Sequence, residues 1–206
     1  MSNGSAPADG VLTPSRVEIE ALCLKTARAA GLEWGLAEDA GRSVAVLERA
    51  GLPGLDWFLA WLESPAGTAV DLGNPAATAL CPIRSGAVLI DHGLRLRLPL
   101  SLPDMIVPGL LIGFLLRHPA GFEMAWSGGK ARIGATRATF EGLPLPLRGP
   151  VALHHAIVTP GSLGHAPRRP CPIAVWQDLN RLALAITVPA TALSRTGAGA
   201  GTHDND

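Results

Sequence analysis

The chain has few cysteines, no recognisable leader and no paired metal-binding motif, and these shortages limit the kind of protein it can be. Cys23, Cys81 and Cys171 are the three cysteines in 206 residues, an odd number without a close pair. They do not form the disulfide framework of a small secreted protein. The chain also begins without a charged, apolar and small-residue leader. We therefore expect a reduced, cytoplasmic protein.

Long apolar runs and net charge are lacking as well. The most apolar stretch, residues 105–116, is about 12 residues long and is interrupted by Pro108, Gly109 and Gly113, whereas a membrane-spanning helix needs about 20. The 17 basic side chains balance the 17 acidic ones. Nucleic-acid affinity comes mainly from a basic surface that neutralises phosphates. We therefore expect neither a membrane span nor a nucleic-acid partner.

The charges are unevenly distributed along the chain. Residues 15–63 hold five Lys or Arg and eight Asp or Glu, whereas residues 64–201 hold twelve and six. The basic excess of the later part favours an anionic small molecule or an acidic partner there. Arginines scattered over a solvated face would give the same count, so both interpretations stay open.

Helix signals are strongest between residues 15 and 63. Ser15 and Glu18 fit a capping box that opens a first helix. Apolar residues at helical spacing predict a second helix over 34–50 and a third over 55–62, which is too apolar for a free surface helix and should cover a core or a partner. We predict one contiguous apolar cluster that contains Leu22, Leu36, Val44, Leu47, Trp57 and Leu62.

Short strands dominate the pattern after residue 64. The predicted elements are strands over 87–90, 94–98, 122–126, 131–140 and 151–158, and helices over 105–117 and 173–186. Asp91-His92-Gly93 would join the first two strands as a hairpin. Because the strands cluster instead of alternating regularly with helices, we predict an α+β fold with a mainly antiparallel sheet and one or two packed helices.

Composition divides the chain into four parts. They are a disordered leader over 1–14, a helical block over 15–63, an α+β body over 75–188, and an extended Gly/Ala-rich tail over 189–206. The glycines of the tail are not followed by a helix, so they match neither a dinucleotide-binding fingerprint nor a P-loop. We expect no cofactor.

The candidate catalytic side chains are few, and they are His92, His155, His165 and Cys171. Neighbouring Asp91 and His92 diverge if the chain is extended there, and adjacent His154 and His155 point to opposite faces of a strand. The spacing of the histidines and cysteines fits no standard zinc motif, so we expect no metal site.

Cysteine occurs twice in the tripeptide Cys-Pro-Ile, at Cys81 and at Cys171. A thiol at the start of a helix has a lowered pKa and can act as a nucleophile, and the helix predicted from residue 173 makes Cys171 the better candidate of the two. The alternative is that it serves as a small buried hydrophobe.

Partner contacts are predicted at one helix face and at the tail. The residues concerned are Trp57, Trp61, Gly197, Gly199, Gly201, Asp204 and Asp206. The two tryptophans share a helical face. The Gly-Ala backbone of the tail would lie close along a partner or the protein's own cleft, while its aspartates and the terminal carboxylate present negative charge. Core packing of the tryptophans and a flexible chain end are the alternatives.

Two blocks of sequence carry a family resemblance. They consist of Ala29-Ala30-Gly31, Trp34-Gly35-Leu36-Ala37-Glu38, Gly41 and Gly51-Leu52-Pro53-Gly54 near the start, and of Val188-Pro189-Ala190, Ser194-Arg195, Gly197-Ala198-Gly199-Ala200-Gly201 and Asp204-Asn205-Asp206 at the end. The chain resembles a family of bacterial proteins known only as a domain of unknown function. The resemblance implies a bacterial cytosolic protein and carries no activity.

Two functional classes remain. The favoured one is a non-catalytic small subunit or binding protein that acts with a metabolic enzyme, through a protein partner or as a homo-oligomer. The alternative is a small-molecule enzyme, a hydrolase or lyase acting on an anionic metabolite, in which the candidate histidines or Cys171 serve as acid, base or nucleophile.

Overall fold

The computed structural model describes residues 10–72, 79–135, 137–158 and 169–184. Three helices form over residues 15–63, as the sequence predicts. The capping box is confirmed, because Ser15 N–H donates to Glu18 Oε2 at 2.7 Å and Glu18 N–H donates to Ser15 Oγ at 3.3 Å. The helices of the described residues are α1 (Arg16–Ala29), α2 (Trp34–Arg49), α3 (Gly54–Leu62), α4 (Pro82–His92), the 3₁₀ turn η1 (Gly93–Arg95), α5 (Gly109–Leu115) and α6 (Ile173–Ala183).

The strands form two sheets. They are β1 (Val11–Leu12), β2 (Leu100–Ile106), β3 (Phe122–Trp126), β4 (Gly129–Gly134), β5 (Arg137–Gly142), β6 (Arg148–His155) and β7 (Cys171–Pro172). The larger sheet has the order β2-β6-β3-β4-β5, and all of its neighbouring strands are antiparallel. The short strands β1 and β7 pair separately. The α+β class is therefore confirmed.

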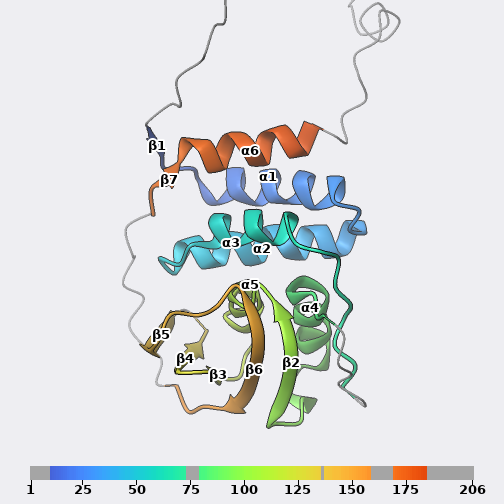
Figure 1. Cartoon of the computed structure of the whole chain (residues 1–206), viewed down its shortest axis with the longest axis vertical. Helices are drawn as coiled ribbons and strands as arrows, with labels where there is room; N and C mark the ends of the chain where they lie inside the picture. Colours follow the sequence, from blue (N-terminus) through green and yellow to red (C-terminus); the bar gives the residue numbers. More distant parts are fainter. Residues whose placement is uncertain (1–9, 73–78, 136, 159–168, 185–206) are drawn as a thin grey trace, which may run out of the picture.

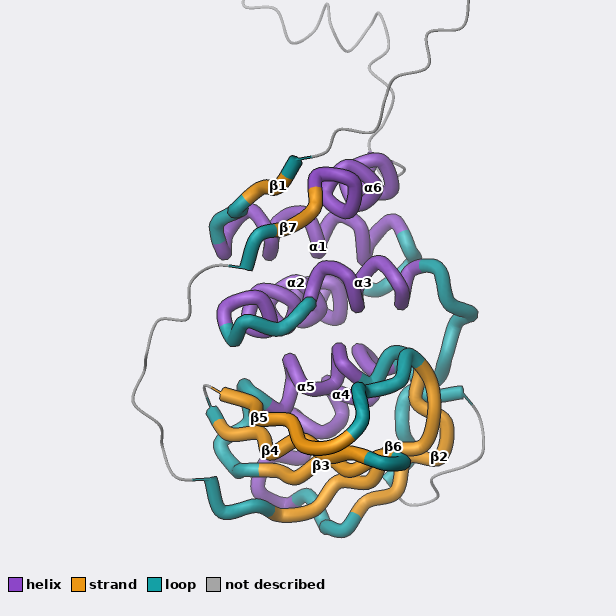
Figure 2. The backbone as a smooth tube through the Cα atoms, turned by 60° about the vertical axis from the view of Figure 1, so that its left-hand side comes forward, coloured by secondary structure: helices purple, strands orange, loops and turns teal. Residues whose placement is uncertain are grey.

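The elements are stacked in layers (Figures 1 and 2). α6 lies on α1, α1 packs on α2, and α3 lies beside α2. α4 and α5 lie between this group of helices and the larger sheet. Within the described ranges, every helix is too short or too polar to cross a membrane.

The hairpin predicted over 87–98 is wrong. Residues 87–92 belong to α4, and the buried face of that helix is formed by Ile83, Gly86 and Leu89, which recur every three residues. Gly86 lets the helix lie directly against the ring of Phe114 in α5, because a Cβ on Gly86 would stand 2.3 Å from that ring. This contact with α5 overrides the local preference of Val88 and its neighbours for strand.

The other predicted elements form with shifted ends. Residues 105 and 106 of the predicted helix over 105–117 end β2, and α5 starts only at Gly109. The 122–126 and 131–140 segments form β3, β4 and β5. The predicted strand over 151–158 is β6, which begins earlier, at Arg148, and ends at His155. The last predicted helix is α6.

α5 joins the helical group to the sheet. All seven of its residues are buried, as expected for a helix that is apolar on every side. Gly109 lies under the ring of Trp57, and a Cβ on Gly113 would stand 2.6 Å from the carbonyl oxygen of Ser43 in α2. At its end, Arg117 donates to Asp39 Oδ1 at 2.8 Å. The two parts of the chain therefore share one core.

The predicted apolar cluster lies within this core. Leu22, Val44 and Leu47 are buried, and Leu36, Trp57 and Leu62 are half-buried and pack against the same cluster. The prediction of one contiguous cluster is therefore confirmed.

Candidate functional site

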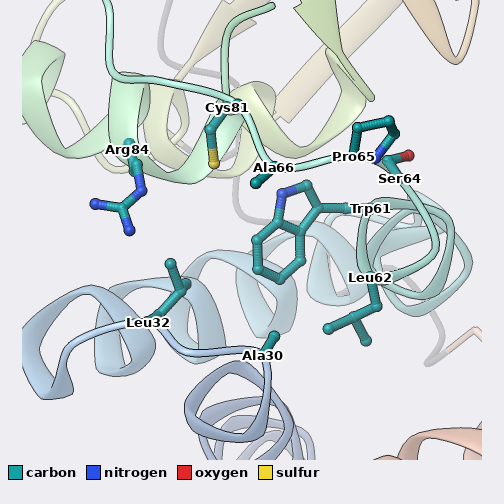
Figure 3. A pocket seen from close by; sticks show the side chains of 10 residues that line it. Ala30, Leu32, Trp61, Leu62, Ser64, Pro65, Ala66, Cys81 and Arg84 are labelled. Carbon is teal, nitrogen blue, oxygen red and sulfur yellow. The ribbon is translucent and has the colours of Figure 1, made fainter.

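A small pocket opens where the group of helices meets α4 (Figure 3). Its volume is about 130 Å³. The end of α1, the end of α3, the loop over 64–67 and the first turn of α4 surround it. Figure 3 shows the indole of Trp61 in the middle of the pocket wall, with Leu32 on one side and Arg84 and Cys81 above. The floor is apolar, and the charge comes from one arginine.

Backbone hydrogen bonds hold the walls of the pocket in place. Cys81 N–H donates to the carbonyl oxygen of Thr68 at 2.8 Å, and Thr68 N–H donates to that of Ala79 at 3.0 Å. These bonds tie the loop after α3 to the start of α4. Trp61 stacks on Phe58 with ring centroids 5.5 Å apart, which fixes the indole at the pocket wall.

The polar groups of the pocket are mainly donors. Within the described part of the chain, neither the Arg84 guanidinium nor the Trp61 indole N–H has a hydrogen-bond or ion-pair partner. The described lining residues include no carboxylate and no imidazole. Arg84 also lies in the first turn of α4, where the helix dipole adds partial positive charge. The charged side of the pocket is therefore positive.

Cys81 is the N-cap residue of α4, and its sulfur faces the pocket (Figure 3). Cys171 instead lies in β7, one residue before the N-cap Pro172 of α6. The lowered pKa expected of Cys171 is wrong, because burial, followed by the charges of Glu48 and Asp56, raises the pKa of this thiol to about 11. Of the two Cys-Pro-Ile tripeptides, the first is therefore the one that reaches a pocket.

A second group of titratable side chains lies around Cys171. It consists of Cys23, Glu48, Asp56, Arg169 and Cys171, and we call it the Glu48 cluster. Glu48 is only 6% exposed, accepts the N–H of Leu55 at 2.8 Å and lies 3.8 Å from Arg169 Nη1. The same Arg169 nitrogen donates to Asp56 Oδ2 at 2.6 Å. Burial raises the pKa of Glu48 against the opposing effects of Leu55 N–H and Arg169.

The structural role of Glu48 is clear from its position. Leu55 is the second residue of α3, and Pro53 at the N-cap of that helix makes no side-chain cap. Glu48 therefore satisfies a free N–H at the start of α3 and places a negative charge at the positive end of the helix dipole. Cys23 is fully buried in the same cluster, and burial raises the pKa of its thiol.

The candidate histidines lie apart from this cluster. His92 is exposed at the end of α4, with its Nδ1 3.1 Å from the carbonyl oxygen of Val88. His155 is exposed at the end of β6, paired with Phe122 of β3, while His165 lies outside the described residues. No hydrogen bond joins His92, His155 or Cys171 to another of the three in the described ranges. Among the same residues, no group of three potential ligands could hold a metal ion.

The predicted partner-binding residues fall in different places. Trp57 is half-buried against Gly109 of α5, and Trp61 is 8% exposed at the pocket. Gly197, Gly199, Gly201, Asp204 and Asp206 lie outside the described residues. A partner role for either group stays a prediction.

Comparison with known proteins finds one family that matches part of the chain. Residues 14–83 match the family described as "Protein of unknown function (DUF3726)". The match covers α1, α2 and α3 and extends to the first turn of α4, so it includes most of the pocket wall. No curated protein and no solved structure matches the chain.

Sequence reasoning missed Arg84 as a site residue, although two signals pointed toward it. The basic excess after residue 64 includes Arg84, and Cys-Pro-Ile stands directly beside it. Its proximity to Trp61, however, depends on the backbone bonds of Thr68 and Cys81, which no local pattern encodes.

Proposed function

We propose that this protein is a non-catalytic binding protein that holds a small anionic molecule in the pocket between Trp61 and Arg84. The observation that carries the proposal is a pocket with an arginine and an indole N–H that lack partners among the described residues, and with no carboxylate or imidazole in its described lining. An arginine pairs with a carboxylate through two parallel hydrogen bonds, which gives geometry as well as affinity.

The size of the pocket limits the ligand. Sites for drug-sized molecules measure about 300–1,000 Å³, and this pocket measures about 130 Å³. Leu32, Leu62 and Trp61 give it apolar walls. A short carboxylate with an apolar end fits these features, whereas a nucleotide is too large.

The enzyme alternative would use the same pocket. Cys81 is the only nucleophile of the described lining besides Ser64, and Ser64 Oγ already donates to the carbonyl oxygen of Ala60 at 2.7 Å. A hydrolase or lyase also needs a general base within hydrogen-bond reach of the reacting group. The described lining residues contain no such base, which favours binding over catalysis.

The proposal is tested by calorimetric titration of the full chain with butyrate, at low salt. Butyramide is the neutral control of matched shape. We expect butyrate to bind and Arg84→Gln to weaken it by about tenfold or more, because a hydrogen bond to a charged group contributes about 1.5–3 kcal/mol. Arg95→Gln, at an exposed arginine outside the pocket, should change the affinity less than about twofold.

Two results would contradict the proposal. Equal binding of butyrate and butyramide would show that charge does not matter in the pocket. Hydrolysis of a carboxylic ester by the protein, observed by NMR and abolished by Cys81→Ser, would favour the enzyme alternative.

A further inference from the structure

The two edges of the five-stranded sheet differ. At the β2 edge, Leu80 N–H donates to the carbonyl oxygen of Asp104 at 2.7 Å, and Ile106 N–H donates to that of Leu80 at 3.0 Å. Pro103 and a shift in register between Leu102 and Met105 further interrupt that strand. Covering, proline and irregular register are the usual protections of an edge strand.

β5 forms the other edge and lacks these protections (Figure 1). Its six residues contain no proline and no lysine, they pair with β4 without a shift in register, and all but Ala138 are exposed. No strand of the described residues lies on its outer side. The edge therefore offers free backbone groups for pairing.

The register decides which backbone groups are free. Leu143 N–H donates to the carbonyl oxygen of Gly128 at 2.8 Å, which continues the β4–β5 register by one residue. Because alternate residues of an antiparallel strand bond to the same neighbour, Thr139 and Glu141 also bond to β4. The N–H and C=O groups of Ala138 and Phe140 therefore point to the open edge.

We infer that β5 pairs antiparallel with β5 of a second copy of this chain, around a two-fold axis at Thr139. In this register, Ala138 and Phe140 of one copy exchange backbone hydrogen bonds with Phe140 and Ala138 of the other. The two five-stranded sheets then form one continuous sheet across the dimer. The contact is isologous, so it closes at two copies.

Charge complementarity selects this register and this occupant. The pairing places Arg137 opposite Glu141 of the second copy, and the two-fold axis repeats the pair at the other end of the contact. Arg137 has no ion pair within the described part of the chain. A shift of the two copies by one residue each would set Thr139 opposite Glu141 and lose both ion pairs.

The other face of the contact is apolar. Phe140 is 41% exposed and lies on the same face as Trp126, with ring centroids 6.3 Å apart. In the dimer, each Phe140 ring covers Ala138 of the other copy, and the two rings are diagonal neighbours. The exposed ring is thereby removed from water.

The test is sedimentation of the full chain over a range of concentrations. We expect wild type to form dimers, whereas Arg137→Glu alone and Glu141→Arg alone each place like charges opposite one another twice and weaken dimerisation by about tenfold or more. A mixture of these two variants restores both ion pairs, so it should form heterodimers with nearly wild-type affinity. Wild type that stays monomeric at every concentration would overturn the proposal, as would single variants that dimerise like wild type.

A backbone variant tests the same contact independently of charge. Ala138→Pro removes an N–H that points to the open edge and leaves the β4 bonds of Thr139 and Glu141 in place, so the fold is retained. We expect this variant to be monomeric with an unchanged circular dichroism spectrum. If the proline variant is folded and still dimeric, the proposal is overturned.

Discussion

The tripeptide Cys-Pro-Ile stands at the start of two helices of this protein, and its two copies have different surroundings. Cys81 is the N-cap of α4, and its sulfur lines an open pocket beside Arg84. Cys171 lies one residue farther from its helix, in β7, where burial, followed by the charges of Glu48 and Asp56, raises the pKa of its thiol. Contacts with other elements, rather than the tripeptide, therefore decide what each thiol can do.

The Glu48 cluster and the pocket also differ in how their arginines are paired. In the Glu48 cluster, Arg169 already pairs with Asp56 and lies near Glu48. In the pocket, Arg84 has no such partner among the described residues. The charges of the Glu48 cluster are already paired within the chain, so substitutions there should affect stability. Substitutions in the pocket should affect binding.

The largest expected effect is on core packing next to the Glu48 cluster. Leu47 is fully buried beside Glu48, so Leu47→Ala should lower the free energy of unfolding by about 2–5 kcal/mol. Leu62→Ala is the control, because this half-buried leucine lines the pocket and should cost less. Urea denaturation measures both. Equal losses would mean that the two regions are packed alike.

Removing Arg169, which lies close to both Asp56 and Glu48, is expected to have the next largest effect. Arg169→Ala leaves Glu48 buried without its positive neighbour and breaks the 2.6 Å bond to Asp56, which should cost about 1–3 kcal/mol. Arg181→Ala removes an exposed arginine that pairs with Asp178, and it should cost less than about 1 kcal/mol. If the Arg169 variant unfolds at the wild-type urea midpoint, the cluster does not stabilise the fold.

Because the pKa of Glu48 is raised, the contribution of the Glu48 cluster to stability depends on pH. The folded state holds this proton more tightly than the unfolded chain, so its stabilisation is fully present below the ordinary value of 4.5 and is lost as the pH rises through the raised folded value. Glu48→Gln should remove this component, and urea midpoints of both proteins from pH 4 to 8 measure it. A constant difference between wild type and variant across that range would contradict the raised pKa.

The smallest effect concerns thiol reactivity, with no change in stability. With a pKa of about 11, only about one Cys171 thiol in a thousand is ionised at pH 8, and the thiolate is the reactive form. Iodoacetamide at pH 8 should therefore modify Cys81, which faces the pocket, before Cys171. Peptide mass spectrometry identifies the site. Faster modification of Cys171 would reverse the comparison.

The sequence predicts the helical block well because its signals are local. The capping box at Ser15 and the helical spacing of Leu22, Val44 and Leu47 each need only a few neighbouring residues to be recognised. The α4 region fails for the opposite reason. Its helix depends on Gly86 lying against Phe114, and the strand-like order of Val88 to Ile90 gives no sign of that contact.

The candidate site is predictable only in outline. The basic excess after residue 64 indicates the part of the chain that carries Arg84, and the apolar third helix indicates Trp61. The pocket itself arises where backbone hydrogen bonds tie the loop after α3 to the start of α4, and no local sequence pattern indicates those bonds. The sequence favours Cys171 over Cys81 because a helix is predicted from residue 173. It gives no sign of the burial and the charges of Glu48 and Asp56 that raise the pKa of Cys171.

The most direct test of the central claim observes the pocket itself, by NMR of the tryptophan indole N–H groups during a butyrate titration. Trp61→Phe identifies the Trp61 signal among the five tryptophans. We predict that this signal moves downfield and saturates as its N–H gains an acceptor, that butyramide does not reproduce the shift, and that Arg84→Gln reduces it while Arg95→Gln does not. A Trp61 signal that stays unmoved while butyrate binds would place the anion elsewhere and contradict the account.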